Sequence, residues 1–182
     1  MWKMEKFTKK TMESFKFKII ISTDIVLTDN NMSTLEDISE TFERIDYFDT
    51  QSLYSCPIDS DSVRKFKLGR GDYEIKFTKG KSLKLCKDRS YIDCVIEFQL
   101  SVDYGSFMII TSEVINNAYE LILENWISER GTRDVDLLID DFGDVLLFWM
   151  KIGDGLYNCI GKFNEEGELV SLEIDFLNIS PI

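Results

Sequence analysis

The sequence predicts an α+β fold in which antiparallel sheet dominates and two amphipathic helices pack on it. Three observations support this prediction. Apolar runs of strand length alternate with Gly- and Asp-rich turns along most of the chain, which is typical of strands joined by tight connections. Two other segments repeat their apolar residues at helical spacing. Finally, 44% of the 182 residues are hydrophobic, which is enough to form a packed core.

The N-terminal part of the chain is expected to contain a short helix, a strand and a capped helix. The short helix is predicted over residues 1–14, and residues 15–27, rich in Ile, Val and Phe, predict a straight or bent strand. A turn at Asp29 precedes Ser33-Thr-Leu-Glu36, a capping box with a hydroxyl at the N-cap and Glu three residues later. The following helix is predicted over 34–47, with an apolar stripe of Leu35, Ile38, Phe42 and Ile45.

The middle of the chain predicts a series of strands. Three short strands are expected at 63–68, 73–77 and 82–87, separated by the turn sequences Gly69-Arg-Gly-Asp and Thr78-Lys-Gly-Lys. We expect these three strands to form neighbouring hairpins. Two more strands are expected at 91–102 and 107–110.

A second helix and a strand-rich segment complete the prediction. The helix is expected to begin at Ser112 and to end before Gly131, where a left-handed residue belongs. Its apolar stripe consists of Ile115, Ala118, Tyr119, Ile122 and Trp126. From Arg133 to Leu177, four apolar runs are separated by three turns that contain Gly and Asp or Asn. This pattern predicts a C-terminal four-stranded antiparallel meander.

Length and composition predict a single compact domain over residues 1–182, with two lobes, 1–90 and 91–182, as the alternative. The order of strand, capped helix and hairpin strands occurs at 15–87 and again at 91–162. An offset of 73 residues aligns Gly80 with Gly153, Leu83 with Leu156 and Cys86 with Cys159. Internal duplication and coincidence are both compatible with these three matches.

Composition excludes several classes of function. The chain has no histidine, which excludes Ser-His-Asp and Cys-His catalysis and histidine metal sites. Its four cysteines form no C-x-x-C pair, so we expect no zinc site. No segment approaches the roughly 20 apolar residues of a membrane span, and no signal peptide is evident. We therefore expect a soluble cytoplasmic protein that is not an enzyme, binds no metal or cofactor and has no membrane partner.

Charge is segregated along the chain, although the net charge is −12. Residues 62–91 carry ten bases against three acids. The bases are Arg64, Lys65, Lys67, Arg70, Lys76, Lys79, Lys81, Lys84, Lys87 and Arg89. Alternation on hairpin strands would place many of them on one sheet face, which is the electrostatic footprint of a phosphate backbone. The alternative interpretation is that the block neutralises the acidic segments or forms a solvated face.

The rest of the chain after residue 91 is acidic. The acids that we expect to contact a partner cluster in the last third of the chain and are Asp134, Asp136, Asp140, Asp141, Asp144, Glu165 and Glu166. An array of carboxylates can imitate nucleic-acid phosphates and occupy the basic cleft of an enzyme that acts on nucleic acid. The alternative is that these acids serve solubility alone.

One spacing in the sequence is consistent with catalysis. Asp59 is followed, fifteen residues later, by Glu74-Ile-Lys76. This resembles the Asp…Glu-x-Lys signature of metal-dependent nucleases of the restriction-endonuclease type, in which two carboxylates hold Mg²⁺ and the lysine stabilises developing charge. A structural pair of Glu74 and Lys76 on one strand is the alternative. The kinase-like Asp141-Phe-Gly lacks the accompanying kinase motifs and is interpreted as a hairpin turn.

In its small size, acidity, lack of histidine and segregated charge, the chain resembles anti-CRISPR proteins of phages and mobile elements, and toxin-immunity proteins. The resemblance implies a non-enzymatic inhibitor whose acidic surfaces bind a basic, nucleic-acid-acting effector such as an RNA-guided DNA nuclease. DNA is a second expected partner, contacted by the basic block. A small Mg²⁺-dependent nuclease and an adaptor protein remain the alternatives, and the oligomeric state is left open.

Overall fold

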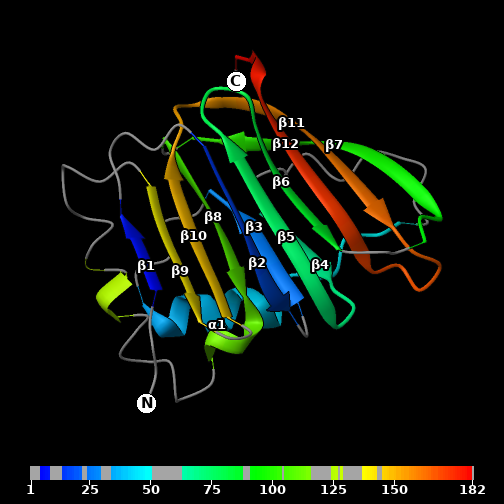
Figure 1. The fold of residues 1–182 in the computed structure, drawn as a ribbon, viewed down its shortest axis with the longest axis horizontal. Helices are drawn as coiled ribbons and strands as arrows, with labels where there is room; N and C mark the ends of the chain where they lie inside the picture. Colours follow the sequence, from blue (N-terminus) through cyan, green and yellow to red (C-terminus); the bar gives the residue numbers. More distant parts are fainter. Residues whose placement is uncertain are drawn as a thin grey trace.

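The computed structural model describes residues 5–8, 14–21, 24–29, 34–50, 63–87, 91–103, 105–115, 124–126, 128, 137–142 and 145–181. Two antiparallel sheets, one α-helix and a 3-10 helix make up this part of the chain (Figure 1). The predicted sheet-rich α+β class is therefore confirmed.

Each sheet has six strands within the described residues. Sheet A has the order β1-β9-β10-β8-β3-β4. Its strands are β1 (Glu5–Thr8), β9 (Leu137–Phe142), β10 (Val145–Lys151), β8 (Ser106–Thr111), β3 (Asp24–Thr28) and β4 (Val63–Lys67). Sheet B has the order β2-β5-β6-β12-β11-β7. Its strands are β2 (Ser14–Ile21), β5 (Gly71–Thr78), β6 (Ser82–Lys87), β12 (Leu169–Ser180), β11 (Gly155–Phe163) and β7 (Cys94–Val102).

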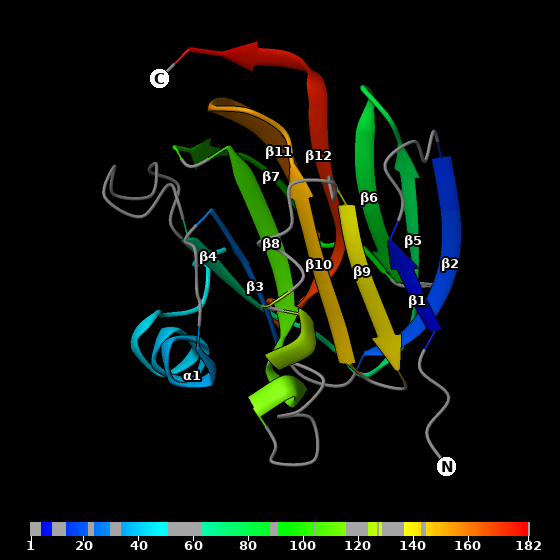
Figure 2. The same cartoon turned by 90° about the vertical axis from the view of Figure 1, so that its left-hand side faces the viewer.

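The elements form three layers, with sheet A in the middle. Helix α1 (Leu35–Arg44) lies on one side of sheet A, next to β3 and β4, and sheet B lies on the other side (Figure 2). The burial pattern of the strands follows from this order. In β3, all of Ile25, Val26 and Leu27 are buried, because both faces of sheet A are covered. In β5, only alternate side chains are buried, because sheet B is covered on one face.

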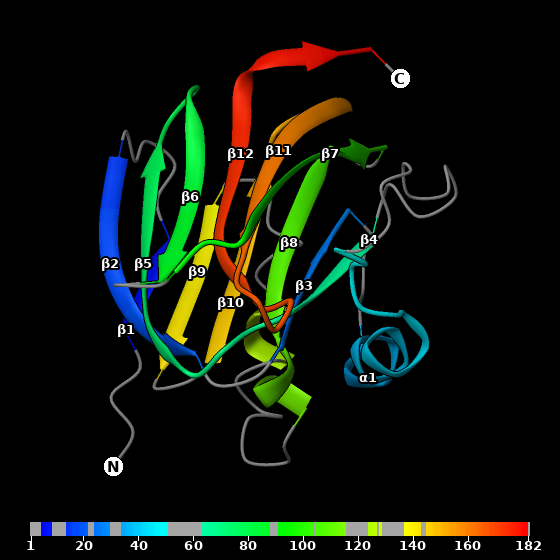
Figure 3. The same ribbon diagram turned by 90° about the vertical axis from the view of Figure 1, so that its right-hand side faces the viewer.

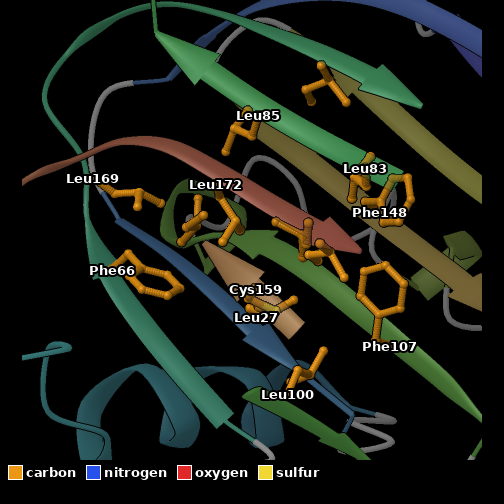
Figure 4. Close-up of a cluster of buried hydrophobic side chains, with 14 of the residues drawn as sticks. Leu27, Phe66, Leu83, Leu85, Leu100, Phe107, Phe148, Cys159, Leu169 and Leu172 are labelled. Carbon is orange, nitrogen blue, oxygen red and sulfur yellow. The ribbon is translucent and has the colours of Figure 1, made fainter. Parts of the chain in front are cut away.

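The main core fills the space between the two sheets (Figure 4). It includes Leu27, Phe66, Leu83, Leu85, Leu100, Phe107, Phe148, Cys159, Leu169 and Leu172. At the end of this core, Phe48 packs against Phe66, Phe98 and Phe163, with ring centroids 5.1 to 5.6 Å apart. A second core lies between sheet A and α1 and contains Val26, Ile38, Phe42, Met108, Ile110, Trp126, Leu147 and Trp149. The odd and even side chains of β3, β8 and β10 thus enter different cores.

The predicted capped helix is confirmed, with different ends. Helix α1 begins one residue later than the predicted box suggests, because Thr34 is its N-cap and accepts a hydrogen bond from the Asp37 N–H at 3.0 Å. The helix ends at Arg44, and Ile45 is its C-cap. The chain then runs beside β4, where the Phe48 N–H donates to the Lys65 carbonyl at 2.8 Å. This contact covers part of the edge of sheet A.

The second predicted helix is described only near its two ends and stays a prediction. Residues Ser112–Ile115 form a 3-10 helix, η2, and residues 124–126 are helical. Trp126, from the predicted apolar stripe, is fully buried in the second core. The remaining stripe residues Ala118, Tyr119 and Ile122, and Gly131, lie outside the described residues.

Two predictions near the N-terminus are wrong. Residues 5–8, expected within a helix, form β1, which pairs with β9. The single strand expected over 15–27 is two strands, since β2 belongs to sheet B and β3 to sheet A. Ser22-Thr23, between them, contains neither Gly nor Pro to mark the change of sheet.

The predicted C-terminal meander is also wrong. β9 pairs with β10 in sheet A, and β11 pairs with β12 in sheet B, but β10 and β11 are not neighbours. The Gly153-Asp-Gly segment therefore carries the chain from one sheet to the other and does not close a hairpin. The antiparallel pairing within each of these two strand pairs is as predicted, and the Asn164–Gly167 turn has Gly167 at a φ of 77°.

The three strands expected to form neighbouring hairpins are separated in the same way. β4 lies in sheet A, whereas β5 and β6 pair in sheet B. The Gly69–Asp72 segment is a crossing between sheets. The Thr78–Lys81 turn is a hairpin as predicted, with the Lys81 N–H donating to the Thr78 carbonyl at 3.0 Å.

Each sheet combines strands from both halves of the chain, three from before residue 91 and three from after it. Residues 1–90 and 91–182 thus contribute strands to the same two sheets, and the number of domains stays a prediction. The proposed duplication stays a prediction. The offset of 73 residues would align Gly80, in the β5–β6 hairpin, with Gly153, in a crossing between sheets.

No helix among the described residues is long and apolar enough to cross a lipid bilayer.

Candidate partner-binding surface

The ten basic residues predicted to contact nucleic acid do not share one sheet face, because their strands belong to two sheets. Six of them are exposed, namely Lys67, Arg70, Lys76, Lys79, Lys81 and Lys84. Lys65 and Lys87 are partly buried, Arg64 is buried, and Arg89 lies outside the described residues. The continuous basic face expected from alternation is thus reduced to smaller groups.

Arg64 is an internal residue that joins the two sheets. Its guanidinium carbon lies 5.9 Å from the ring centroid of Phe48 and 5.6 Å from that of Phe98, within the range of cation–π attraction. Its Nη2 donates to the Gln99 carbonyl at 3.2 Å. Arg64 thereby links β4, at the edge of sheet A, to β7, at the edge of sheet B. Only 4% of the residue is exposed, so its side chain is not accessible to DNA in this structure.

Lys65 holds the end of helix α1. Its Nζ donates to the Phe42 carbonyl in the last turns of the helix at 2.7 Å, where a cation is favoured by the helix dipole. The same Nζ lies 4.4 Å from the ring centroid of Tyr47. The Tyr47 hydroxyl donates to Asp24 Oδ2 at 2.7 Å, and this hydrogen bond raises the pKa of Tyr47 to about 12. The role of Lys65 here is structural.

The largest exposed basic group that remains is the β5–β6 hairpin. Lys76 and Lys84 are directly opposite each other on the two strands, and Lys79 and Lys81 lie in the connecting turn. Lys84 also forms an ion pair with Glu173 of β12 at 3.8 Å. Four exposed lysines at one end of a hairpin are the part of the basic block that suits a phosphate backbone.

The nuclease-like residues are placed only in part. Glu74 and Lys76 both lie on β5, two residues apart and on the same face, with Lys76 exposed and Glu74 partly buried. Asp59 lies outside the described residues. The described residues contain no group of three or more acids or thiols with the geometry to hold a metal ion. The nuclease alternative therefore stays a prediction.

The predicted acidic partner residues occupy two regions. Asp140 and Asp141 lie on β9, where their backbone positions are opposite Lys6 and Glu5 of β1. Glu165 and Glu166 are exposed in the turn between β11 and β12. Asp134, Asp136 and Asp144 lie outside the described residues.

The β11–β12 turn is rigidly built. Asn164 Oδ1 accepts hydrogen bonds from the Glu166 and Glu168 N–H groups at 3.1 and 2.9 Å, and its Nδ2 donates to Glu168 Oε1 at 3.0 Å. An asparagine that bonds the backbone two residues on is a common turn device. The turn therefore presents Glu165 and Glu166 in a defined place.

A tyrosine accompanies these two acids. Tyr91 is 72% exposed, and with Asn164, Glu165 and Glu166 it lines a shallow hollow of about 380 Å³. Ile92, the next residue, is 42% exposed. We call Tyr91, Glu165 and Glu166 the acidic turn surface. The sequence predicted the two acids, but Tyr91 was expected merely to begin a strand.

A second acidic region was missed by sequence reasoning. Glu97 on β7 and Glu173 and Asp175 on β12 line a concavity of about 490 Å³ on sheet B. Within it, Gln99 Nε2 donates to Asn158 Oδ1 at 3.2 Å. The pKa of Asp175 is lowered, chiefly because it accepts a hydrogen bond from the Leu177 N–H. The three acids of this concavity come from β7 and β12, which are far apart in the sequence, and no local sequence motif identifies them.

Three aspartates meet where the chain crosses from β7 to β8. Asp29, 2% exposed, accepts from the Asp103 N–H through Oδ2 at 2.9 Å, while its Oδ1 has no hydrogen-bond partner among the described residues. Asp154 Oδ1 accepts from the Gly105 N–H at 2.8 Å. Burial, with the nearby charges of Asp103 and Asp154 as lesser contributors, raises the pKa of Asp29.

We expect Asp29→Asn to stabilise the protein at neutral pH by about 1 kcal/mol, because it removes a buried charge and keeps an oxygen for the Asp103 N–H. A raised pKa in the folded state favours folding below the unfolded-state pKa and disfavours it as pH rises through the folded-state pKa. Urea unfolding should therefore show wild-type stability falling relative to the variant as pH rises above the usual aspartate pKa and through the raised pKa of Asp29. Parallel pH profiles would contradict this assignment, and Asp46→Asn, at an exposed residue, is the control.

Cys86, Cys94 and Cys159 are free thiols, and Cys56 lies outside the described residues. Burial raises the pKa of Cys159 to about 12, so this thiol is an unreactive core residue.

Comparison of the chain with protein-family models, curated proteins and solved structures finds no match.

Proposed function

We propose that this protein is a non-enzymatic inhibitor that binds a basic, nucleic-acid-acting effector protein through the acidic turn surface. The observation that carries the proposal is that an exposed tyrosine, Tyr91, lies beside the exposed carboxylates of Glu165 and Glu166. An RNA-guided DNA nuclease, whose nucleic-acid channel is positively charged, is the effector class that we propose.

The chemistry of this surface supports binding to a basic protein. Tyrosine is enriched at interface hot spots, because its ring buries apolar area while its hydroxyl remains available for a hydrogen bond. Neighbouring carboxylates attract a basic surface, accelerate encounter and fix the orientation of the complex. The hydrogen bonds of Asn164 hold the turn in place before binding, so little conformational entropy is lost there.

The hairpin lysines would extend the contact to nucleic acid. Lys79 and Lys81 are exposed in the β5–β6 turn, and Lys76 is exposed just before it. In a complex with a DNA-bound or guide-bound effector, these side chains are available to phosphate groups. We therefore propose a DNA contact by these lysines and not by Arg64.

The binding test is a titration of immobilised, guide-loaded RNA-guided DNA nuclease with the purified protein. We expect Tyr91→Ala to weaken binding about tenfold or more, and the double variant Glu165→Lys with Glu166→Lys to weaken it further. The matched control is Glu40→Lys with Glu43→Lys, which makes the same change in net charge on the exposed side of α1. Equal affinity of all variants would reject the acidic turn surface as the contact.

A further inference from the structure

The outer face of sheet B is the broad face of the sandwich that no other described element covers. Figure 3 shows β2, β5, β6, β12 and β11 side by side, with α1 at the far side of the molecule next to β4. Six strands spaced about 4.8 Å apart make this face roughly 25 Å wide. Its width suits contact with another protein.

Strand register places the charges of this face in two rows. The first row crosses the strands in the order Lys76, Lys84, Glu173, Ile160 and Glu97. The second row runs parallel to it in the order Glu74, Cys86, Ser171, Lys162 and Val95. The burial pattern confirms that these are the outward positions, because their neighbours Ile75, Leu85, Leu172 and Cys159 are in the main core.

In both rows, positions at equal distances on the two sides of the boundary between β6 and β12 can be compared for charge. Lys84 on β6 is mirrored across the boundary by Glu173 on β12. Glu74 on β5, one strand further out, is mirrored by Lys162 on β11. Lys76 is mirrored by the uncharged Ile160, and Cys86 by Ser171. Every charged side chain in the inner four columns of the two rows is thus mirrored by an opposite or a neutral one.

We propose that the outer face of sheet B binds a second copy of this chain. A two-fold axis that runs between β6 and β12, parallel to the strands, brings β6 over the β12 of the other copy and β5 over its β11. Lys84 then faces Glu173, and Glu74 faces Lys162, in both directions, which makes four contacts between opposite charges. An interface around a two-fold axis must be self-complementary, and this face meets that requirement.

The complementarity depends on the position of the axis. An axis along β12 would bring Glu173 against its own copy, and an axis along β6 would do the same for Lys84. Both arrangements bring like charges together, which is unfavourable in an interface from which water is excluded. Of these three axis positions, the charge pattern favours the one between β6 and β12.

The test uses two single variants that are expected to complement each other. Glu74→Lys and Lys162→Glu should each raise the dimer dissociation constant about tenfold or more, because each turns two attractive contacts into repulsive ones. When the two variants are mixed, both contacts are opposite in charge again, so the mixture should dimerise like the wild type. The measurement is sedimentation equilibrium of each protein and of the equimolar mixture, up to about 100 µM.

Glu74 and Lys162 suit this test because β6 and β12 lie between their strands. A contact between these two residues within one molecule therefore cannot explain the recovery of dimerisation in the mixture. Glu36→Lys and Lys67→Glu, at exposed positions on α1 and β4, are controls with the same charge changes. The proposal is overturned if the wild type is monomeric over the whole range, or if the mixture stays monomeric while the wild type dimerises. No effector is needed, so this outcome is independent of the inhibitor proposal.

Discussion

Replacing Arg64 with alanine is expected to lower the free energy of unfolding by about 3 kcal/mol. The guanidinium lies within cation–π distance of the rings of Phe48 and Phe98 and donates a hydrogen bond to the Gln99 carbonyl of β7. Cation–π contacts away from water contribute about 2 kcal/mol, and a hydrogen bond from a charged donor about 1.5–3 kcal/mol. Alanine also leaves a cavity beside two aromatic rings. The free energy of unfolding is measured by urea denaturation.

Two controls separate this structural role from a role in binding DNA. Arg70, exposed in the crossing from β4 to β5, should tolerate alanine with a change of less than about 0.5 kcal/mol. Arg64→Lys keeps the charge but loses the planar group that contacts the rings, and we expect it to be destabilised as well. If Arg64→Ala were as stable as the wild type and instead lost affinity for DNA, the assignment of Arg64 to the interior would be wrong.

Replacing Phe163 with alanine is expected to have the largest effect, a loss of about 4 kcal/mol in the free energy of unfolding. Phe163 is 1% exposed, and its ring is stacked on that of Phe48 with 5.6 Å between centroids. The ring also lies over Gly161, where an added Cβ would be 2.8 Å from a ring carbon. Truncation removes these contacts and leaves a cavity that the surrounding strands cannot fill.

A conservative variant, Phe163→Leu, serves as the comparison for Phe163→Ala. Phe163→Leu retains most of the apolar volume and should cost about 1 kcal/mol, so that the two variants differ clearly in thermal unfolding midpoint. Gly161→Ala should itself destabilise the protein, because the new methyl group requires the ring to move. A loss below about 1 kcal/mol for Phe163→Ala would show that this part of the core is loosely packed.

Local sequence signals predicted individual elements well. The helical stripe predicted for α1 includes Ile38 and Phe42, which are buried, and the strand predicted at 73–77 lies within β5, where alternate side chains are buried. The Thr78–Lys81 and Asn164–Gly167 hairpins were also recognised, because Gly at positive φ marks such turns. These features depend on residues close together in the chain, and a single sequence contains that information.

The assignment of strands to sheets could not be predicted in this way. Gly69–Asp72 and Gly153–Gly155 have turn composition, but each carries the chain between sheets instead of closing a hairpin. The composition of such a segment indicates that the chain changes direction there. It does not indicate which strands become neighbours in a sheet. For this reason the predicted meander and the predicted basic face were both wrong, and the burial of Arg64 was not foreseen.

Sequence patterns likewise predicted single residues of the candidate site but not how distant segments come together in it. Glu165 and Glu166 could be recognised from an acidic turn sequence, but their neighbour Tyr91 precedes β7 and is separated from them by more than 70 residues. The concavity lined by Glu97, Glu173 and Asp175 likewise requires knowledge of strand order. Surfaces assembled from distant segments depend on the fold and are not visible in local patterns.

The most direct test of the proposed function is inhibition of DNA cleavage by a guide-loaded RNA-guided DNA nuclease. We expect the wild-type protein and the Glu40→Lys, Glu43→Lys variant to stop cleavage at similar concentrations. The Glu165→Lys, Glu166→Lys variant should require about tenfold more protein or fail to inhibit. Cleavage that continues unchanged in excess wild-type protein, or inhibition that is equally strong in both double variants, would contradict the account.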